Sequence, residues 1–408
     1  MPRAGVPHAA HLHNILGRAQ RHLARLIPDI EGRLLTVGGV AADVAEDTSV
    51  FEFGVRMPQR SLGLRLWSLS RSGVEALIWE ELRPHLGGLL DVRTGRVVGL
   101  DRASGGNRDE MAGSGHVRGV RVDIVDTPHV IAADVIVDAM GGRSPMTRWL
   151  AEGSEAPERE VLRLRQWYAT SAVNLGSRAP SERHFWLSFP TSPRTRGALL
   201  SPTGHGMWKV SVNGVGADPM PRTVTELKDY VASLEDVELV DLLNGGGEVS
   251  DDLVWDPPVA FAKPTAHWVR WDRAGDSTPI FAVGDSVASL NPLFGQGLSG
   301  ALWEVEWASA AIAKWHGGEQ SLEASIAAYR EESGEIRAAM WRLMNVFEPD
   351  LGEGLSERDL TAIVGKVIED PGAHRRLVET WHLLRSVDTF HELAGQGVSP
   401  ETVSGLWA

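Results

Sequence analysis

The chain has 408 residues, 43% of them hydrophobic, and is therefore long enough to bury a large core. Its formal net charge of −14 argues against a nucleic-acid or anionic-membrane surface and suits a soluble cytoplasmic protein. The absence of cysteine excludes disulfides, thiolate nucleophiles and cysteine-ligated metals. No apolar stretch is long enough to span a bilayer.

The beginning of the chain predicts two helices with a strand between them. Apolar residues recur at helical spacing over residues 7–26, and Pro28 follows this predicted helix. Residues 64–70 alternate as a strand does. A second helix is predicted over residues 71–82, with Ser72 as its N-cap.

The next segments predict strands that lead into a glycine turn. Residues 89–100 and 117–125 are typical of strands, with a loop rich in Gly and Ser between them. Ile136 and Val137 belong to a predicted buried strand. The segment DAMGGRSP, over residues 138–145, then forms a turn before a new helix.

The middle of the chain predicts an antiparallel sheet. Residues 162–215 are divided into short alternating or apolar segments by Gly and Pro turns. Several of these segments carry Trp, which offers a large apolar area with a single hydrogen-bond donor. A helical stretch is predicted over residues 223–234.

The most informative stretch is FAVGDSVASLNPLFGQGLSGAL, over residues 281–302. An apolar strand ends at the turn residues Gly284 and Asp285, and a second turn begins at residues 291–292. Residues 295–297 then present nearly bare backbone before a helix. Unpaired N–H groups and the dipole at that helix start suit an anion or an electron-rich ring edge. Further helices are predicted beyond residue 302.

This stretch resembles the second flavin-contacting motif of the FAD-dependent monooxygenases of the para-hydroxybenzoate hydroxylase and squalene epoxidase type. The resemblance is best over residues 1–320, and residues 138–145 resemble the family's middle motif. It implies an α/β fold with an FAD/NAD(P)-binding, glutathione-reductase-like three-layer core. A mixed or antiparallel substrate sheet and C-terminal helices complete that fold. The middle motif departs from the family pattern at Met140, Arg143 and Pro145.

The resemblance also implies roles for individual residues. Asp285, preceded by Gly284, would hold the ribityl chain of FAD, and Arg71 would lie near the flavin. The cofactor performs the hard chemical step in this family, so no catalytic side chain is assigned. The residues that would line the flavin are Pro292, Gly295, Gln296, Gly297 and Leu298. The residues expected to form the wall of the substrate cavity are Trp167, Trp186, Phe189, Trp208 and Phe294.

One family motif has no counterpart in this chain. The chain opens where the family's first βαβ unit, which carries Gly-x-Gly-x-x-Gly, would end. Three explanations stay open: a misplaced start codon in a complete flavoenzyme, a second chain that supplies the unit, or loss of FAD. The fold class is therefore expected to be a core lacking its first βαβ unit.

The sequence predicts four regions. They are a partial FAD-binding-type domain over 1–160, a substrate-binding sheet domain over 161–275, a return to the first domain over 276–320, and a helical region over 321–408. The main hypothesis is a flavin-dependent monooxygenase-like oxidoreductase that uses FAD and NAD(P)H. It would hydroxylate or epoxidise a hydrophobic small molecule, in secondary metabolism such as antibiotic biosynthesis.

The alternative hypothesis is a redox-neutral cyclase or isomerase on the same scaffold, independent of flavin. His184, His205 or Asp285 would then act as a general acid or base. Three histidines cluster near the start of the chain, but no nearby carboxylate completes a zinc site, so no metal is expected. The expected partner is a hydrophobic small molecule.

Overall fold

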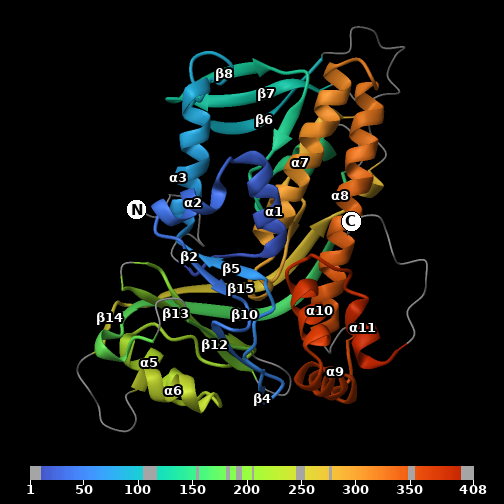
Figure 1. The fold of residues 1–408 in the computed structure, drawn as a ribbon. Helices are drawn as coiled ribbons and strands as arrows, with labels where there is room; N and C mark the ends of the chain where they lie inside the picture. Colours follow the sequence, from blue (N-terminus) through green and yellow to red (C-terminus); the bar gives the residue numbers. More distant parts are fainter. Residues whose placement is uncertain are drawn as a thin grey trace.

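The computed structural model describes residues 11–103, 117–152, 156–180, 184–189, 195–204, 206–244, 253–274, 278–347 and 354–396. The chain folds into a mixed α/β structure around one large sheet (Figure 1). The long helices and three small sheets lie on one side of the large sheet, and a helix pair lies on its other side (Figure 1). This arrangement confirms the α/β fold class with a mixed sheet and C-terminal helices.

The large sheet has nine strands in the order β17-β15-β10-β13-β12-β11-β3-β4, with β14 paired to β10. All neighbouring pairs are antiparallel except β11 and β3. The antiparallel sheet predicted over residues 162–215 is therefore confirmed. The strands are β3 (Thr48–Glu52), β4 (Val55–Arg56), β10 (Arg159–Asn174), β11 (Phe185–Ser188), β12 (Arg196–Pro202), β13 (Trp208–Val215), β14 (Val254–Trp255), β15 (Val259–Val269) and β17 (Ala288–Ser289).

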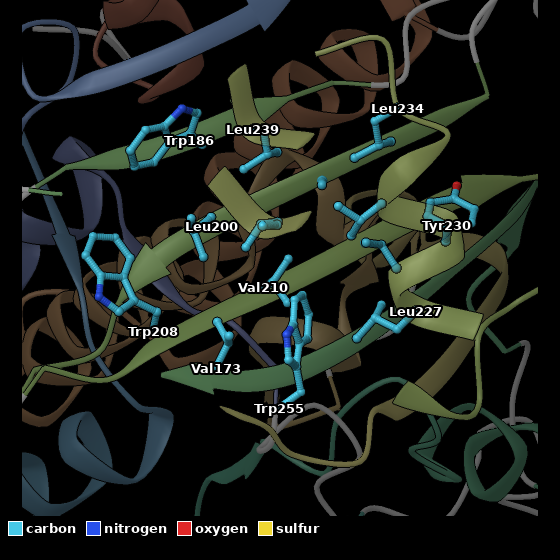
Figure 2. Close-up of a cluster of buried hydrophobic side chains, with 14 of the residues drawn as sticks. Val173, Trp186, Leu200, Trp208, Val210, Leu227, Tyr230, Leu234, Leu239 and Trp255 are labelled. Atoms are coloured by element: carbon cyan, nitrogen blue, oxygen red, sulfur yellow. The ribbon is translucent and has the colours of Figure 1, made fainter. Parts of the chain in front are cut away.

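The two faces of this sheet differ in chemistry because side chains alternate along each strand. One face carries a large apolar cluster that includes Trp167, Val173 and Val210, and it is covered by α5 (Val224–Ala232) and α6 (Val237–Asn244). Figure 2 shows this cluster between the strands and the two helices. The opposite face carries the intervening residues, which include more polar side chains.

A second sheet holds the motif stretch. Strands β9 (Ile136–Asp138) and β16 (Ile280–Ala282) run parallel, so their carboxyl ends meet at one edge. Helices α7 (Gly297–His316) and α8 (Leu322–Phe347) pack together beside it, and Phe281 of β16 packs against Tyr329 of α8. The strand, turn and helix predicted over residues 281–302 are thus confirmed.

Two further sheets and several helices complete this half of the molecule. One sheet has the order β1-β5-β2, and the other has the order β6-β7-β8. Their strands are β1 (Asn14–Ile15), β2 (Val40–Asp43), β5 (Arg65–Ser68), β6 (Arg96–Arg102), β7 (Val117–Ile124) and β8 (Thr127–Ala132). The helices are α1 (Gly17–Leu26), α2 (Ile30–Thr36), α3 (Arg71–Leu82) and α4 (Met146–Ala151).

Three C-terminal helices pack against one end of the large sheet. They are α9 (Glu357–Glu369), α10 (Pro371–Trp381) and α11 (Thr389–Ala394). Their apolar cluster receives Val50 and Val55 from the β3–β4 hairpin. Among the helices of the described residues, none combines the length and the hydropathy needed to cross a membrane.

The structure corrects two local predictions. Ser70, and not Ser72, caps α3, because the Ser70 hydroxyl accepts a 3.1 Å hydrogen bond from the Gly73 N–H. The strand predicted over residues 89–100 is shifted: β6 runs from Arg96 to Arg102. The physical reason is that β6 pairs with β7, whose register extends to Arg102.

Candidate functional site

The turn after β16 presents a carboxylate at the edge where the two parallel strands end. Gly284 has a φ of +64°, a conformation that favours glycine. Its N–H donates to Glu304 Oε2 at 2.6 Å, and its carbonyl accepts from Arg337 Nη2 at 3.1 Å. Asp285, the next residue, is exposed. The turn therefore holds its backbone inward and presents Asp285 to solvent.

The turn after β9 is tied to the same edge by Asp138. This buried carboxylate accepts hydrogen bonds from the Met140 N–H at 3.0 Å and from the Ser144 hydroxyl at 2.6 Å. Ser286, next to Asp285, donates to Asp138 at 3.3 Å and accepts from the Gly141 N–H at 3.0 Å. The segment predicted as a middle motif thus braces the turn that carries Asp285.

Two basic side chains from the large sheet lie close to this edge. Lys263 of β15 donates to the Ser289 hydroxyl at 2.6 Å, and Ser289 in turn donates to Asp285 Oδ2 at 3.2 Å. Burial lowers the pKa of Lys263, while the Asp285 carboxylate raises it. Burial also lowers the pKa of His267 to about 4, and the positive charges of Arg159 and Lys263 act in the same direction. His267 is therefore neutral near pH 7.

The glycine loop before α7 leaves its backbone open. Asn291 accepts from the Leu293 N–H at 3.0 Å, which starts a single helical turn, η6 (Pro292–Phe294). Gly295 ends that turn with a φ of +66°. A Cβ atom placed on Gly297 would meet no other atom within 4 Å. The loop thus offers bare, exposed backbone at the start of α7.

The side chain between the two glycines points the other way. Gln296 is 2% exposed, and its Nε2 donates to the Trp381 carbonyl at 3.2 Å. Gln296 therefore anchors the loop to the end of α10 and leaves the adjacent glycines open. Pro292 is exposed and Leu298 is half-buried beside them.

An aromatic group lies next to this loop, on the sheet face opposite α5 and α6. Phe294 and Trp381 stack with ring centroids 5.4 Å apart, and Phe189 stacks on Trp381 at 6.1 Å. The Tyr168 hydroxyl lies 2.8 Å from Asn291 Oδ1. The predicted wall residues Phe189 and Phe294 are therefore brought together.

The three tryptophans predicted for the same wall lie elsewhere. Trp167, Trp186 and Trp208 are at most 8% exposed and belong to the cluster under α5 and α6. Trp186 and Trp208 are labelled in Figure 2, within that cluster. They fill the core on the opposite face of the sheet from the Phe294 side chain.

Other predicted site residues have partners of their own or lie outside the described residues. Arg71 forms an ion pair with Glu75 on its own helix, at 3.0 Å. His184 bonds to the Ser49 hydroxyl at 2.9 Å, and its pKa is lowered by burial. His205 lies outside the described residues. Among the described residues, no hydrogen bond joins His184 to Asp285 as an acid–base pair.

The residues of this edge fit the FAD implied by the family resemblance. The resemblance implies that the flavin ring lies against open backbone at a helix start, and the empty space beside Gly297 would admit it. The resemblance also implies that a carboxylate accepts hydrogen bonds from the ribityl chain, and the exposed Asp285 is able to do so. The two features come from consecutive turns of one stretch of chain.

The structure adds site residues that the sequence did not indicate. Glu304 and Arg337 contact the Gly284 backbone from α7 and α8, and Trp381 contacts the loop from α10. A signal for Glu304 was available, since it is a lone acidic residue in the apolar run Ala301–Val305. Arg337 and Trp381 carry no such signal, because only tertiary packing brings them to the loop.

The sequence was compared with known protein families and with individual proteins. No protein-family model matches it. Protein Rv3254 of Mycobacterium tuberculosis is 25% identical in an alignment of 318 residues that covers 73% of this chain. The chain spans 62% of the length of that curated relative.

Solved structures resemble the chain over most of its length. The flavin-dependent brominase Bmp2 matches 92% of this chain and 84% of its own, at a TM-score of 0.64 and 15% identity. The p-nitrophenol 4-monooxygenase PnpA of Pseudomonas putida matches 93% of this chain and 90% of its own, at a TM-score of 0.63 and 15% identity. A single-residue variant of HpxO from Klebsiella pneumoniae, solved with FAD, matches 91% of this chain and 89% of its own, at a TM-score of 0.59 and 14% identity. The chain has the fold of these three proteins, and the fold class that the sequence predicted is confirmed.

Proposed function

We propose that this chain binds FAD along the edge formed by Asp285 and the Gly295–Gly297 loop and catalyses a monooxygenase reaction on a hydrophobic aromatic molecule. The observation that carries the proposal is the pairing of an exposed carboxylate with bare backbone at the start of α7. The solved HpxO structure, which has this fold and contains FAD, supports the same assignment. Reduced flavin, when bound, activates molecular oxygen, with NAD(P)H as the proposed source of electrons.

The residues of the chain have separate roles in this proposal. Asp285 accepts hydrogen bonds from the ribityl hydroxyls. The N–H groups at Gly297 and Leu298, with the dipole of the 20-residue helix α7, stabilise negative charge on the ring. Gln296 keeps the loop open by bonding to the Trp381 carbonyl.

The substrate class follows from the aromatic group beside the loop. Phe189 and Phe294 each stack on Trp381, and we infer that this apolar group forms a wall against which a planar molecule packs and from which water is excluded. Tyr168 and Asn291 are buried and hydrogen-bonded to each other beside this group, which gives its border a polar character. Both features favour an aromatic molecule that carries a polar substituent.

Oxygen uptake tests the proposal. Purified protein is loaded with FAD, and NAD(P)H-dependent oxygen consumption is measured with a panel of aromatic compounds. We expect at least one compound to raise the rate, and Asp285→Ala to reduce it through weaker FAD binding. Conversion of a substrate without oxygen, NAD(P)H or flavin would instead support the redox-neutral alternative.

A further inference from the structure

The backbone of Gly284 is held at its N–H and at its carbonyl by one buried ion pair. Glu304 accepts from its N–H and Arg337 donates to its carbonyl, as described above. Arg337 also pairs with Glu304 through two parallel hydrogen bonds, from Nε to Oε1 at 2.7 Å and from Nη2 to Oε2 at 2.6 Å. The pair thus closes a ring of hydrogen bonds around a single glycine.

Both charges are removed from solvent. The Glu304 and Arg337 side chains are 0% and 1% exposed. Burial alone would lower the pKa of Arg337, but Glu304 raises it above its ordinary value, so the guanidinium stays charged. A buried pair of this kind is a costly way to stabilise a fold, because an apolar pair of similar size avoids the desolvation of two charges.

The surroundings fix the geometry of the pair. The Ser333 hydroxyl donates a hydrogen bond to Glu304 Oε1 at 2.9 Å, so the carboxylate has a third partner besides Arg337 and Gly284. A Cβ atom on Gly300 would lie 2.8 Å from Arg337 Nη1 and 3.0 Å from Met340 Sδ. Gly300 therefore allows the guanidinium to approach α7 closely. These contacts hold both side chains of the pair in place.

We propose that Glu304 and Arg337 are positioning residues that lock the backbone of Gly284 in its left-handed conformation and so turn the Asp285 carboxylate outward for the cofactor. The inference rests on the proposed function for the identity of the ligand. The lock itself is a property of the protein without ligand, because every contact in it lies within the chain. Removing the negative charge of Glu304 leaves Arg337 buried without a counter-ion and weakens the bond to the Gly284 N–H.

Two measurements on Glu304→Gln test the lock. The first is hydrogen–deuterium exchange of a peptide covering residues 280–290 in the protein without flavin. The second is the FAD dissociation constant from quenching of flavin fluorescence. We expect exchange at Gly284 to become roughly tenfold faster or more, and FAD affinity to fall by a similar factor. Arg337→Lys, which keeps the charge but loses the planar fork, should give intermediate values.

A matched control separates positioning from general destabilisation. Leu227→Ala removes a fully buried side chain from the cluster under α5 and α6, on the far face of the large sheet. It should lower the melting temperature yet leave both measurements unchanged. If Glu304→Gln does not fold, Ser333→Ala removes the third contact of the Glu304 carboxylate but keeps the ion pair, and it should give changes of about two- to fivefold.

The outcomes are distinguishable. A folded Glu304→Gln protein with wild-type exchange and wild-type FAD affinity overturns the inference. If Asp285→Ala weakens FAD binding and Glu304→Gln does not, the flavin proposal stands and the positioning role falls. If the unsubstituted protein binds no FAD, the proposed function fails, and the exchange measurement alone decides whether the lock exists.

Discussion

The buried carboxyl of Glu52 makes the stability of this protein depend on pH. Glu52 ends strand β3 and is 5% exposed, directly before the hairpin turn at Phe53 and Gly54. Burial raises its pKa from 4.5 to about 8. Glu52 is therefore protonated in the folded protein at neutral pH, whereas the same residue in the unfolded chain is ionised.

The sign and the size of the effect follow from these two values. Between pH 4.5 and about 8 the folded state holds one proton more than the unfolded state, so the free energy of unfolding decreases as the pH rises. Each pH unit lowers the free energy of unfolding by about 1.4 kcal/mol, and the whole range from pH 4.5 to about 8 lowers it by about 5 kcal/mol. This stabilisation is complete below pH 4.5 and is lost as the pH approaches 8.

Glu52→Gln removes the titration and keeps the shape of the side chain. Urea unfolding of both proteins at pH 5, 6, 7 and 8 gives the difference in their free energies of unfolding. We expect the variant to gain about 1.4 kcal/mol relative to its parent with each pH unit. Other titrating groups are common to both proteins and cancel in the difference. Parallel pH profiles for the two proteins would refute the assignment of a raised pKa to Glu52.

Three further predictions concern other parts of the fold. Ser70→Ala should cost about 0.5–2 kcal/mol in urea unfolding, because it removes the cap of α3, while Ser72→Ala should change stability by less than about 0.5 kcal/mol. Equal costs would show that Ser70 is not the cap. Trp208→Ala should destabilise the protein by about 3–5 kcal/mol and leave the FAD dissociation constant unchanged, since Trp208 belongs to the core under α5 and α6. A weakened FAD affinity in the folded variant would show that Trp208 belongs to the site after all. His382 accepts a 3.1 Å hydrogen bond from the Gly17 N–H, and burial lowers its pKa to about 4. Its contribution should be lost as the pH falls from 6.5 towards 4, and His382→Asn should flatten that part of the urea-unfolding profile; an unchanged slope would contradict the neutral buried ring.

The sequence predicted the parts of this fold that depend on local pattern. Alternation and Gly/Pro turns located the antiparallel sheet, and the strand, turn and helix around Asp285 lie where the motif placed them. Strand β8 was not predicted, because most of its residues, Thr127–Ala132, are exposed and show no alternation of apolar and polar side chains. Strand pairing, not pattern, forms this element.

The site was predictable only in part, for a similar reason. Alternation places Trp167 and Tyr168 on opposite faces of β10, but it does not say which face the helices α5 and α6 cover. The contacts of Glu304 with Arg337 join residues on two helices, and Trp381 reaches the loop from a third. Such contacts depend on how helices pack, which short sequence patterns do not encode.

The central claim is that the open backbone before α7 receives a flavin ring. Gly297→Leu tests it most directly, because the new side chain enters empty space beside the loop and costs the fold little. Gly365→Leu on α9 is the matched control, since that glycine is also exposed with no atom within 4 Å of its Cβ position. We predict that titration with FAD gives binding to the unsubstituted protein and to Gly365→Leu, and none to Gly297→Leu. Equal FAD affinity in all three proteins would contradict the account.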